Sequence, residues 1–304
     1  MTDHRSGFAC FIGRPNAGKS TLMNALVGSK VAITSPKPQT TRHTIRGIVH
    51  RPEAQLIIID TPGLHRPRTL LGERLNDLVR STWAEVDAIG FCIAADERPG
   101  PGDRYILGEI AGLKRPIVGI VTKSDALAHE AMPEQLMAMQ SAAESAGVEL
   151  ADIVPVSALS GDNVGELVDV LVSHLPAGPM LYPEGDITDE PEETLISELI
   201  REAALEGVRD ELPHSIAVTI NEMGLVEDRP AESPMLRIFA EIHVERDSQK
   251  GIMIGHRGER LRSVGTRARK QIEALLGTPV YLDLHVRVAK DWQRDPKQLR
   301  RLGF

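Results

Sequence analysis

The chain has 304 residues, of which 41% are hydrophobic and 26% charged, and its formal net charge is −8. This composition is ordinary for a soluble globular protein of about two domains, and it excludes a chain that is basic throughout. Residues 250–304 nevertheless carry thirteen Lys and Arg against five Asp and Glu, so we expect only this part to contact a polyanion.

The first half of the chain alternates short apolar runs with helical patterns. Strands are predicted at Phe8–Ile12, Gly47–His50, Gln55–Asp60, Ala88–Ala94, Ile117–Thr122 and Ile153–Val156. Helices are predicted near 19–27, 70–83, 103–113, 132–146 and 164–174. Most of these strands are apolar throughout, which is typical of strands covered on both faces. Residues 1–175 are therefore predicted to form an α/β domain, a mostly parallel sheet flanked by helices.

The pattern breaks over residues 176–193. This segment, PAGPMLYPEGDITDEPEE, contains four prolines and six acidic residues, and it contains no Lys or Arg. The composition predicts a linker that repulsion from the acidic body keeps extended.

Residues 194–304 have a different order of predicted helices and strands. Thr194–Leu212 has helical spacing, with an apolar stripe at Leu195, Leu199, Ala203 and Val208. Strands are predicted at Ser215–Glu222, Leu236–Glu245 and Val280–Val288, with a glycine-flanked turn and a basic helix before the last of them and a short basic helix at about 296–302. The order helix, strand, strand, turn and helix, strand predicts an α+β domain, and it resembles the order of KH domains of the bacterial, type II, arrangement.

A phosphate-loop pattern follows the first predicted strand. The pattern G-x-x-x-x-G-K-[ST] is matched by Gly13-Arg14-Pro15-Asn16-Ala17-Gly18-Lys19-Ser20. The match opens a predicted helix, which is the context that phosphate binding by such a loop requires. The glycines let successive backbone N–H groups face one point at the helix N-terminus, which makes an anion site. We expect Lys19 to span the β- and γ-phosphates of a nucleotide and the Ser20 hydroxyl to bind Mg²⁺.

Two further elements fit the same site. The run LIIIDTPG places Asp60 at the end of a buried strand, where its carboxylate would hold Mg²⁺ through a water, and Gly63 would donate its N–H to the γ-phosphate. A nucleotide switch also needs an oxygen ligand from a loop that reaches Mg²⁺ when the γ-phosphate is present. Within PQTTRH at 38–43, Thr41 is the candidate and Thr40 the alternative; threonines in such loops often cap turns instead.

The base is predicted from two motifs at later strand ends. In VTKSD at 121–125, the Asp125 carboxylate would accept hydrogen bonds from the N1–H and the amine of guanine, a donor pair that adenine lacks, and Lys123 would lie along the base. In VSALSG, the backbone N–H groups of Ser157, Ala158 and Leu159 would meet guanine O6.

A G-x-x-G loop lies in the basic part of the chain. Gly255-His256-Arg257-Gly258 separates an apolar segment from an arginine-rich helix. In KH domains such a loop clamps the backbone phosphates of about four unstacked nucleotides. Arg257, Arg260 and His256 would add charge there, whereas Arg262, Arg267, Arg269 and Lys270 either join them or form an ordinary solvated helix face.

The ordered set GRPNAGKS, TTR, DTPG, TKSD and SAL resembles small GTPases of the translation-factor-related class, and within them the Era subfamily. The resemblance continues through PEGDITDEPEE, IMIGHRG and the closing DWQRDPKQLRRLGF, and so covers nearly the whole chain. It implies a Mg²⁺-dependent GTPase with slow intrinsic turnover that binds GTP and GDP. It also implies an RNA partner, the 3′ end of 16S ribosomal RNA, and a role in assembly of the 30S subunit.

These inferences define the predicted site residues. Lys19, Thr41 and Gly63 are assigned to catalysis, and Ser20, Thr41 and Asp60 to the metal. The nucleotide is assigned to Gly13, Arg14, Pro15, Asn16, Ala17, Gly18, Lys19, Ser20, Thr21, Asp60, Thr61, Pro62, Gly63, Leu64, Thr122, Lys123, Asp125, Ser157, Ala158 and Leu159. RNA is assigned to Gly255, His256, Arg257, Gly258 and Arg260.

Three positions bear on how far the resemblance extends. Thr122 stands where the family usually has Asn, so we expect somewhat weaker nucleotide binding with the guanine preference kept. Leu64 cannot orient a water as the Gln of many GTPases does, and the resemblance implies a class with a hydrophobic residue there. In related GTPases an Asn at the position of Asn16 helps to bind K⁺; here Asn16 is either such a ligand or a plain loop former.

Two other functions were weighed against this one. The first is an RNA chaperone that holds GTP as a structural ligand. The second is a tRNA-modification GTPase, which would need a tetrahydrofolate domain and a C-terminal cysteine that these 304 residues do not contain.

Cys10 and Cys92 lie in apolar runs and are expected to be buried and unpaired. With a polar start and no run of about 18 apolar residues, we expect a cytoplasmic monomer without a transmembrane segment. The resemblance to the Era subfamily also implies peripheral contact with the inner face of the cell membrane.

Overall fold

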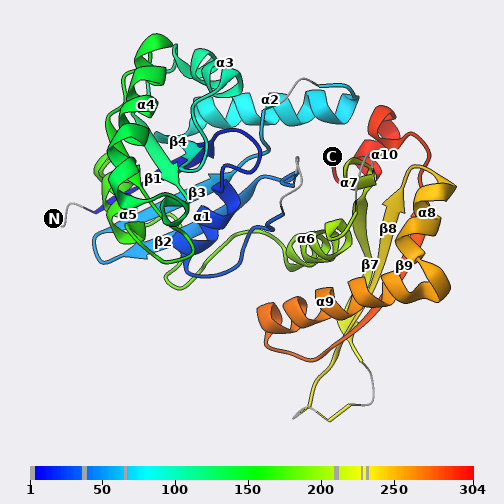
Figure 1. Cartoon of the computed structure of the whole chain (residues 1–304). Helices are drawn as coiled ribbons and strands as arrows, with labels where there is room; N and C mark the ends of the chain where they lie inside the picture. Colours follow the sequence, from blue (N-terminus) through cyan, green and yellow to red (C-terminus); the bar gives the residue numbers. More distant parts are fainter. Residues whose placement is uncertain (1–3, 36–39, 65–66, 209–211, 227–228, 231–232) are drawn as a thin grey trace. The chain divides into compact units, whose positions relative to one another are not determined.

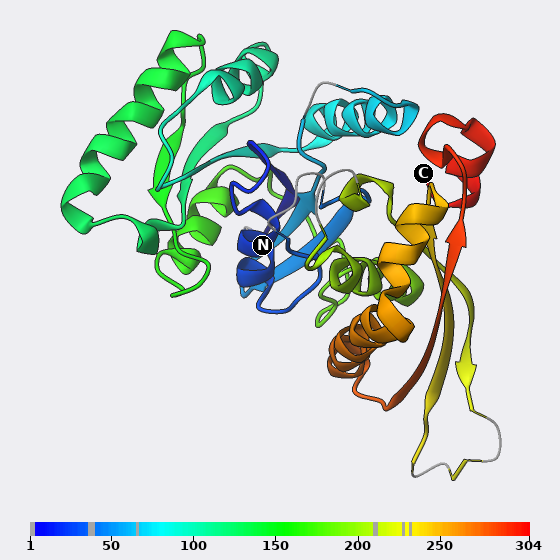
Figure 2. The same cartoon turned by 45° about the vertical axis from the view of Figure 1, so that its right-hand side comes forward.

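The computed structural model describes residues 4–35, 40–64, 67–208, 212–226, 229–230 and 233–304. The chain divides into two compact units, one formed by Met1–Arg66 with Leu75–Asp189 and the other by Pro67–Arg74 with Glu190–Phe304. Figures 1 and 2 show the α/β architecture of the first unit and the α+β architecture of the second. Among the described residues, no helix combines the length and the apolar character that crossing a membrane requires.

The first unit is built on a six-stranded sheet of order β2-β3-β1-β4-β5-β6. Its strands are β1 (Arg5–Ile12), β2 (Ile45–Arg51), β3 (Ala54–Asp60), β4 (Ala88–Ala94), β5 (Ile117–Thr122) and β6 (Asp152–Pro155). All neighbouring pairs are parallel except β2 with β3, which pair antiparallel. The exception follows from chain length, because only two residues join β2 to β3 and a parallel crossover needs a dozen or more.

Helices cover both faces of this sheet. They are α1 (Lys19–Val27), α2 (Leu70–Glu85), α3 (Pro101–Ile110), α4 (Met132–Ser145) and α5 (Val164–Ser173). Side chains of α1 and α5 share one apolar cluster with the sheet. Side chains of α2, α3 and α4 share another with its opposite face. Strands buried on both faces read as continuous apolar runs, which is why their positions could be predicted within a few residues.

The acidic segment after α5 has packing partners in the first unit. Gln55, which is fully buried, accepts hydrogen bonds from the backbone N–H groups of Leu181 and Tyr182 and donates to the Tyr182 carbonyl. The N–H of Ile48 on the edge strand β2 donates to the carbonyl of Ile187. Repulsion from the acidic body was expected to keep this segment extended; in the structure, hydrogen bonds with Gln55 and Ile48 also hold its residues against the sheet.

The second unit contains a three-stranded sheet of order β7-β8-β9. Its strands are β7 (Ala217–Leu225), β8 (Leu236–Val244) and β9 (Val280–Val288), with β8 antiparallel to β7 and parallel to β9. Its helices are α6 (Glu192–Leu205), α7 (Leu212–Ser215), α8 (Asp247–Ile254), α9 (Glu259–Leu276) and α10 (Pro296–Arg301). The alternate residues Ile238, Ala240, Ile242 and Val244 of β8 are fully buried.

Two local features of the second unit differ from the sequence prediction. The helix expected over Thr194–Leu212 ends at Leu205, shortly before Gly207, which adopts a left-handed φ of 71°. The chain before the G-x-x-G loop was not predicted to be helical, but Asp247–Ile254 forms α8. The Gln249 side chain begins this helix by accepting hydrogen bonds from the backbone N–H groups of Glu245 and Arg246, a signal that the apolar run after it obscured.

Candidate functional site

The loop between β1 and α1 has the backbone geometry of a phosphate cradle. Gly18 precedes the first residue of α1 with φ 81°, and Asn16 also has a left-handed φ of 66°. Gly13, at φ 156°, lies so close to β4 that a Cβ atom there would be 2.4 Å from the carbonyl oxygen of Cys92. Glycine is therefore required at position 13 by a close approach and at position 18 by conformation. The loop ends at the N-terminus of α1, where backbone N–H groups favour an anion.

Lys19 lies inside this loop. Its side chain is buried, and Nζ donates hydrogen bonds to the carbonyls of Gly13 (3.0 Å) and Arg14 (2.9 Å). Burial lowers the pKa of Lys19, and the nearby Asp60 carboxylate opposes this shift. A desolvated ammonium of this kind gains from an anionic partner, which the nucleotide phosphates would supply.

Three oxygen-bearing side chains meet beside the loop. The Ser20 and Thr41 hydroxyls both donate to Oδ2 of Asp60, at 2.7 and 2.9 Å, and the two hydroxyl oxygens are 3.2 Å apart. The alternative residue Thr40 instead donates to the Ser35 carbonyl at 3.3 Å. Asp60 is fully buried at the end of β3. One carboxylate and two hydroxyls form the hard oxygen donor set that suits Mg²⁺, so the residues present fit this ion.

A cavity of about 590 Å³ opens over these groups. The predicted residues that line it are Pro15, Asn16, Gly18, Lys19, Ser20, Thr21, Thr41, Thr61, Gly63 and Lys123. The alternative residue Thr40 also lines it, together with four residues that the sequence analysis did not assign to the site, namely Ile33, Thr34, Ser35 and Glu97. Arg14 was also assigned to the nucleotide; its side chain contacts Asp103 and Glu97.

Leu64 faces the protein interior rather than solvent. It is 8% exposed and belongs to the apolar cluster that contains Val79 and Trp83 of α2. A water-positioning role for this side chain is thus excluded by its position as well as by its chemistry. Thr61 and Pro62 are also buried and join Leu64 in lining a small space beside Lys19.

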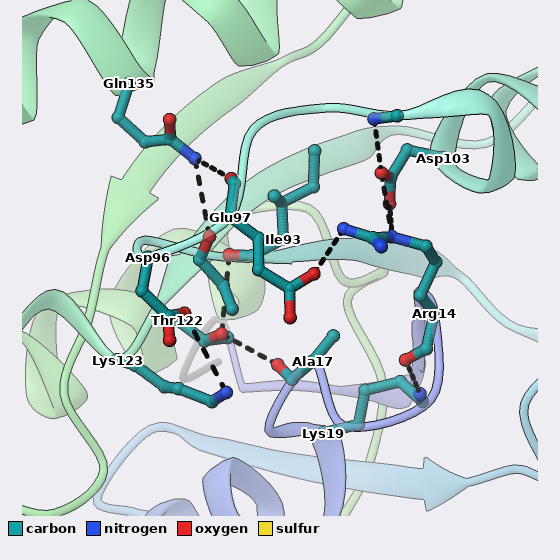
Figure 3. A network of polar contacts seen from close by, with 12 residues as sticks. Arg14, Ala17, Lys19, Ile93, Asp96, Glu97, Asp103, Thr122, Lys123 and Gln135 are labelled. Carbon is teal, nitrogen blue, oxygen red and sulfur yellow. Dashed lines mark hydrogen bonds and ion pairs between the residues drawn. The ribbon is translucent and has the colours of Figure 1, made fainter. Parts of the chain in front are cut away.

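The residues predicted to bind the base lie at the ends of β5 and β6. The Thr122 hydroxyl donates to the carbonyl of Ala17 in the phosphate loop at 2.7 Å, as Figure 3 shows. Lys123 has a left-handed φ of 55°, and its ammonium is 3.9 Å from Asp96. The buried Ser157 hydroxyl donates to Oδ1 of the exposed Asp125 carboxylate, so the two motifs predicted to read the base are in contact.

Two further residues predicted to bind the base are partly or largely exposed to solvent. Leu159 is 82% exposed and Ala158 is half-buried. Neither of them, nor Asp125 or Ser157, is among the described residues that line the 590 Å³ cavity. The predicted base contacts therefore lie beside the phosphate cavity, toward solvent.

In the second unit, the G-x-x-G loop joins α8 to α9. Gly255 and Gly258 have φ values of 73° and 78°, and Arg257 also lies in the left-handed region at 48°. A Cβ atom on Gly255 would be 2.7 Å from Cβ of Arg260. His256 and Arg257 are exposed at the tip, so both are available to a ligand.

Arg260 has a different environment from the one predicted. Its guanidinium donates to the carbonyls of Ala204 (3.2 Å) and Glu206 (2.8 Å) at the C-terminal end of α6. Arg267 donates to the neighbouring Ala203 carbonyl, at 3.1 Å. Burial lowers the pKa of Arg260, and the charge of Arg267 lowers it further. Both arginines thus satisfy helix carbonyls, whereas Arg262 and Arg269 are exposed.

A groove of about 340 Å³ runs between α9 and β9. The residues that line it are Gly258, Leu261, Arg262, Gly265, Thr266, Arg269, Tyr281, Leu282, and Leu284. Of these, the sequence analysis assigned Gly258 to RNA and left Arg262 and Arg269 open as either RNA contacts or a solvated helix face. Gly265, a glycine inside a helix, was the available signal, although a Cβ there would meet Leu284 only at an ordinary contact distance of 3.5 Å.

The fold and the loop define a P-loop GTP-binding domain followed by a KH domain. Residues 8–123 match the family model described as "50S ribosome-binding GTPase", and residues 211–293 match the model of the KH domain. The chain is 67% identical to GTPase Era of Streptomyces coelicolor over 100% of this chain and 96% of that protein. It is 63% identical to GTPase Era of Mycolicibacterium smegmatis over the full length of both.

Solved structures agree with these relatives. A crystal structure of Era in complex with MgGDPNP and nucleotides 1506–1542 of 16S ribosomal RNA superimposes with a TM-score of 0.91, at 40% identity over 99% of each chain. A variant of Aquifex aeolicus Era bound to GDP and aluminium fluoride superimposes with a TM-score of 0.92, at 39% identity over 98% of this chain and 99% of the other. The chain belongs to the Era family of GTPases.

Proposed function

We propose that this chain is a GTP-hydrolysing switch that binds the 3′ end of 16S ribosomal RNA through its KH domain during assembly of the 30S subunit. The observation that carries the first part is the meeting of Ser20, Thr41 and Asp60 beside the buried Lys19. The RNA partner rests on the family, since an Era structure holds that RNA, and on the excess of basic residues after position 249.

Ser20, Thr41 and Asp60 would hold Mg²⁺, which neutralises charge on the phosphates of the nucleotide. The residues of the chain supply the remainder of the chemistry. The loop amides and the Lys19 ammonium lie where negative charge develops on the transferred phosphoryl group. Gly63 lines the cavity and would donate its N–H to the γ-phosphate. The hydrolysis of GTP is thus mostly positioning and charge neutralisation, and we expect slow turnover without a partner.

Thr41 connects the nucleotide to the conformation of its loop. It comes from a segment between α1 and β2 and reaches Asp60 by a single hydroxyl contact. Loss of the γ-phosphate would remove a partner from this segment and allow it to leave. On this proposal the nucleotide state changes the loop first and RNA binding second.

On the RNA side, the exposed tip residues His256 and Arg257 would contact phosphates, while the groove between α9 and β9 would receive bases. Arg262 and Arg269 at the groove are better placed for this role than Arg260, which is engaged with α6. The chain would act as a monomer in the cytoplasm, with peripheral contact at the inner face of the cell membrane and K⁺ as an additional cofactor. These finer points rest on the family resemblance alone.

The test is RNA crosslinking together with a GTPase assay on the full chain. With an RNA ending in the 16S 3′ sequence, crosslinks should map to the G-x-x-G loop and the groove, and their yield should differ between GTP analogue, GDP and no nucleotide. Lys19→Ala should lower hydrolysis by about 10²- to 10³-fold. Lys30→Ala, which removes an exposed lysine just after α1, is the matched control.

Two outcomes would contradict the proposal. Unchanged hydrolysis in Lys19→Ala would show that the loop is not the catalytic site. RNA crosslinks of equal yield in all nucleotide states would favour the RNA chaperone that holds GTP as a structural ligand.

A further inference from the structure

Arg14 is the second residue of the phosphate loop, and its side chain lies outside the cradle. Its Nε donates to Asp103 at 2.9 Å, and its terminal nitrogen contacts the Glu97 carboxylate. Figure 3 shows the guanidinium between these two carboxylates, with the backbone carbonyl of Arg14 turned toward Lys19. The same residue therefore contributes an acceptor for the Lys19 ammonium on one side and a cation for two carboxylates on the other.

The two carboxylates have different environments. Asp103 is 1% exposed in the first turn of α3, where it also accepts a hydrogen bond of 2.8 Å from the N–H of Gly100. Glu97 is 42% exposed, lies in the connection between β4 and α3, and lines the phosphate cavity. Its backbone is held by the buried Gln135, whose amide donates to the Glu97 carbonyl at 2.7 Å. Asp103 is thus an anchor for Arg14, and Glu97 is a fixed negative charge at the cavity.

A negative charge at the position of Glu97 disfavours the binding of an anion in the cavity that it lines. The cavity is built for the phosphates of a nucleotide, and a like charge at its wall repels them. Burial alone would lower the pKa of Arg14, but hydrogen bonds to Asp103 and Glu97 and the charges of both raise it above the ordinary arginine value. The guanidinium is therefore a permanent cation at the point where Glu97 needs a counter-charge.

We infer that Arg14 is a positioning residue of the phosphate site: Asp103 fixes its guanidinium, and the guanidinium neutralises Glu97 at the cavity so that the phosphates can bind. The inference rests on the proposed GTP site and adds a specific electrostatic dependence to it. Removal of Arg14 leaves Glu97 uncompensated, and the loss in nucleotide affinity arises from Glu97 rather than from a missing contact to the ligand.

This dependence is tested by a double-mutant cycle on the full chain, with titration of fluorescent GDP as the readout. Arg14→Gln should weaken GDP binding by about tenfold or more, equivalent to about 1.4 kcal/mol. Arg14→Gln with Glu97→Gln should recover most of the loss, and Glu97→Gln alone, which removes the negative charge from the cavity wall, should bind GDP more tightly than the unaltered chain. The defect of Arg14→Gln should also shrink when salt is raised from about 0.05 to 0.5 M, because screening reduces the repulsion.

Arg14→Lys provides a second variant, since it keeps the charge and loses the fork of donors; it should bind GDP better than Arg14→Gln. Circular dichroism of every variant verifies the fold. GDP affinity unchanged in Arg14→Gln, or a defect that Glu97→Gln does not relieve, would overturn the inference. If the unaltered chain binds neither GDP nor GTP, the proposed function itself fails, which is a separate result from the cycle.

Discussion

The hydroxyl of Thr122, at the end of β5, donates a 2.7 Å hydrogen bond to the carbonyl of Ala17 in the phosphate loop. The same hydroxyl oxygen lies 3.4 Å from the Ile93 carbonyl, and a hydroxyl has one proton to donate. Thr122 therefore braces the loop where the family usually has Asn, but it has no second donor for the base. The brace spans more than a hundred residues of sequence and joins the phosphate end of the site to the base end.

Loss of this brace should weaken nucleotide binding. Thr122→Val keeps the shape and removes the hydroxyl, which leaves the buried Ala17 carbonyl without this donor. A hydrogen bond of this kind contributes about 0.5–1.5 kcal/mol, so GDP affinity should fall by roughly 2- to 12-fold. Isothermal titration calorimetry measures the change. Thr122→Ser retains the hydroxyl and should stay near the unaltered chain; an equal defect in both variants would assign the effect to packing.

Monovalent cations provide a test of Asn16. This residue has a left-handed φ and lines the phosphate cavity, while Leu64 is packed in the core and cannot orient a water. If Asn16 helps to bind K⁺, GTP hydrolysis should be faster in potassium than in sodium chloride at equal ionic strength. Asn16→Ala should abolish that difference. Equal rates in the two salts would leave Asn16 as a loop former.

Substitution of two arginines near the G-x-x-G loop should affect RNA binding in one case and the stability of the KH domain in the other. Arg257→Ala removes an exposed charge at the tip and should weaken RNA binding and its salt dependence while leaving the unfolding midpoint unchanged. Arg260→Ala removes two hydrogen bonds to the end of α6 and should destabilise the KH domain by about 1–3 kcal/mol. Filter binding and urea unfolding make the comparison, with the exposed Arg294→Ala as a charge-matched control. The reverse pattern would restore Arg260 as the RNA contact.

The stability of the KH domain should fall in mild acid. His243 on β8 is 4% exposed, and its Nε2 lies 2.9 Å from the Thr219 hydroxyl. Burial lowers the pKa of His243, the charges of Arg301 and Arg287 lower it too, and Glu241 opposes them. The unfolded chain therefore binds more protons here than the native one. This stability is fully present above pH 6.5, the ordinary value, and is lost as the pH falls from there through the lowered pKa of the folded chain.

Urea unfolding followed by Trp292, which is buried in this domain, measures the pH dependence in a Trp83→Phe background. Between pH 7.5 and 5.5 the parent should lose stability more steeply than His243→Gln. His285→Gln, which alters a half-exposed histidine on β9, is the control and should keep the steep profile. Parallel profiles for all three proteins would exclude His243 as the origin.

Much of the nucleotide site could be predicted because its signals are local. The glycines of the phosphate loop, the lysine that opens α1 and the polar residues after each buried strand depend on backbone conformation over a few residues. Parallel strands then bring their carboxyl ends to one edge, so Asp60, Thr122 and Ser157 were expected near one another from their positions alone. The packing of the linker, the C-terminal end of α6 and the formation of α8 could not be predicted from local sequence, because they depend on contacts with residues distant in the chain.

The amino-acid sequence by itself determined the fold class, the phosphate loop, the base motif and the basic KH segment, since glycine conformation, burial pattern and charge are properties of short stretches. Tertiary structure decided which side chains meet. It selected Thr41 over Thr40 beside Asp60, paired the Arg14 side chain with Asp103 and with Glu97 at the cavity wall, and engaged Arg260 with the carbonyls of α6. A long side chain can reach several partners from one backbone position, and the partner that it takes depends on which distant element the fold places within hydrogen-bonding distance.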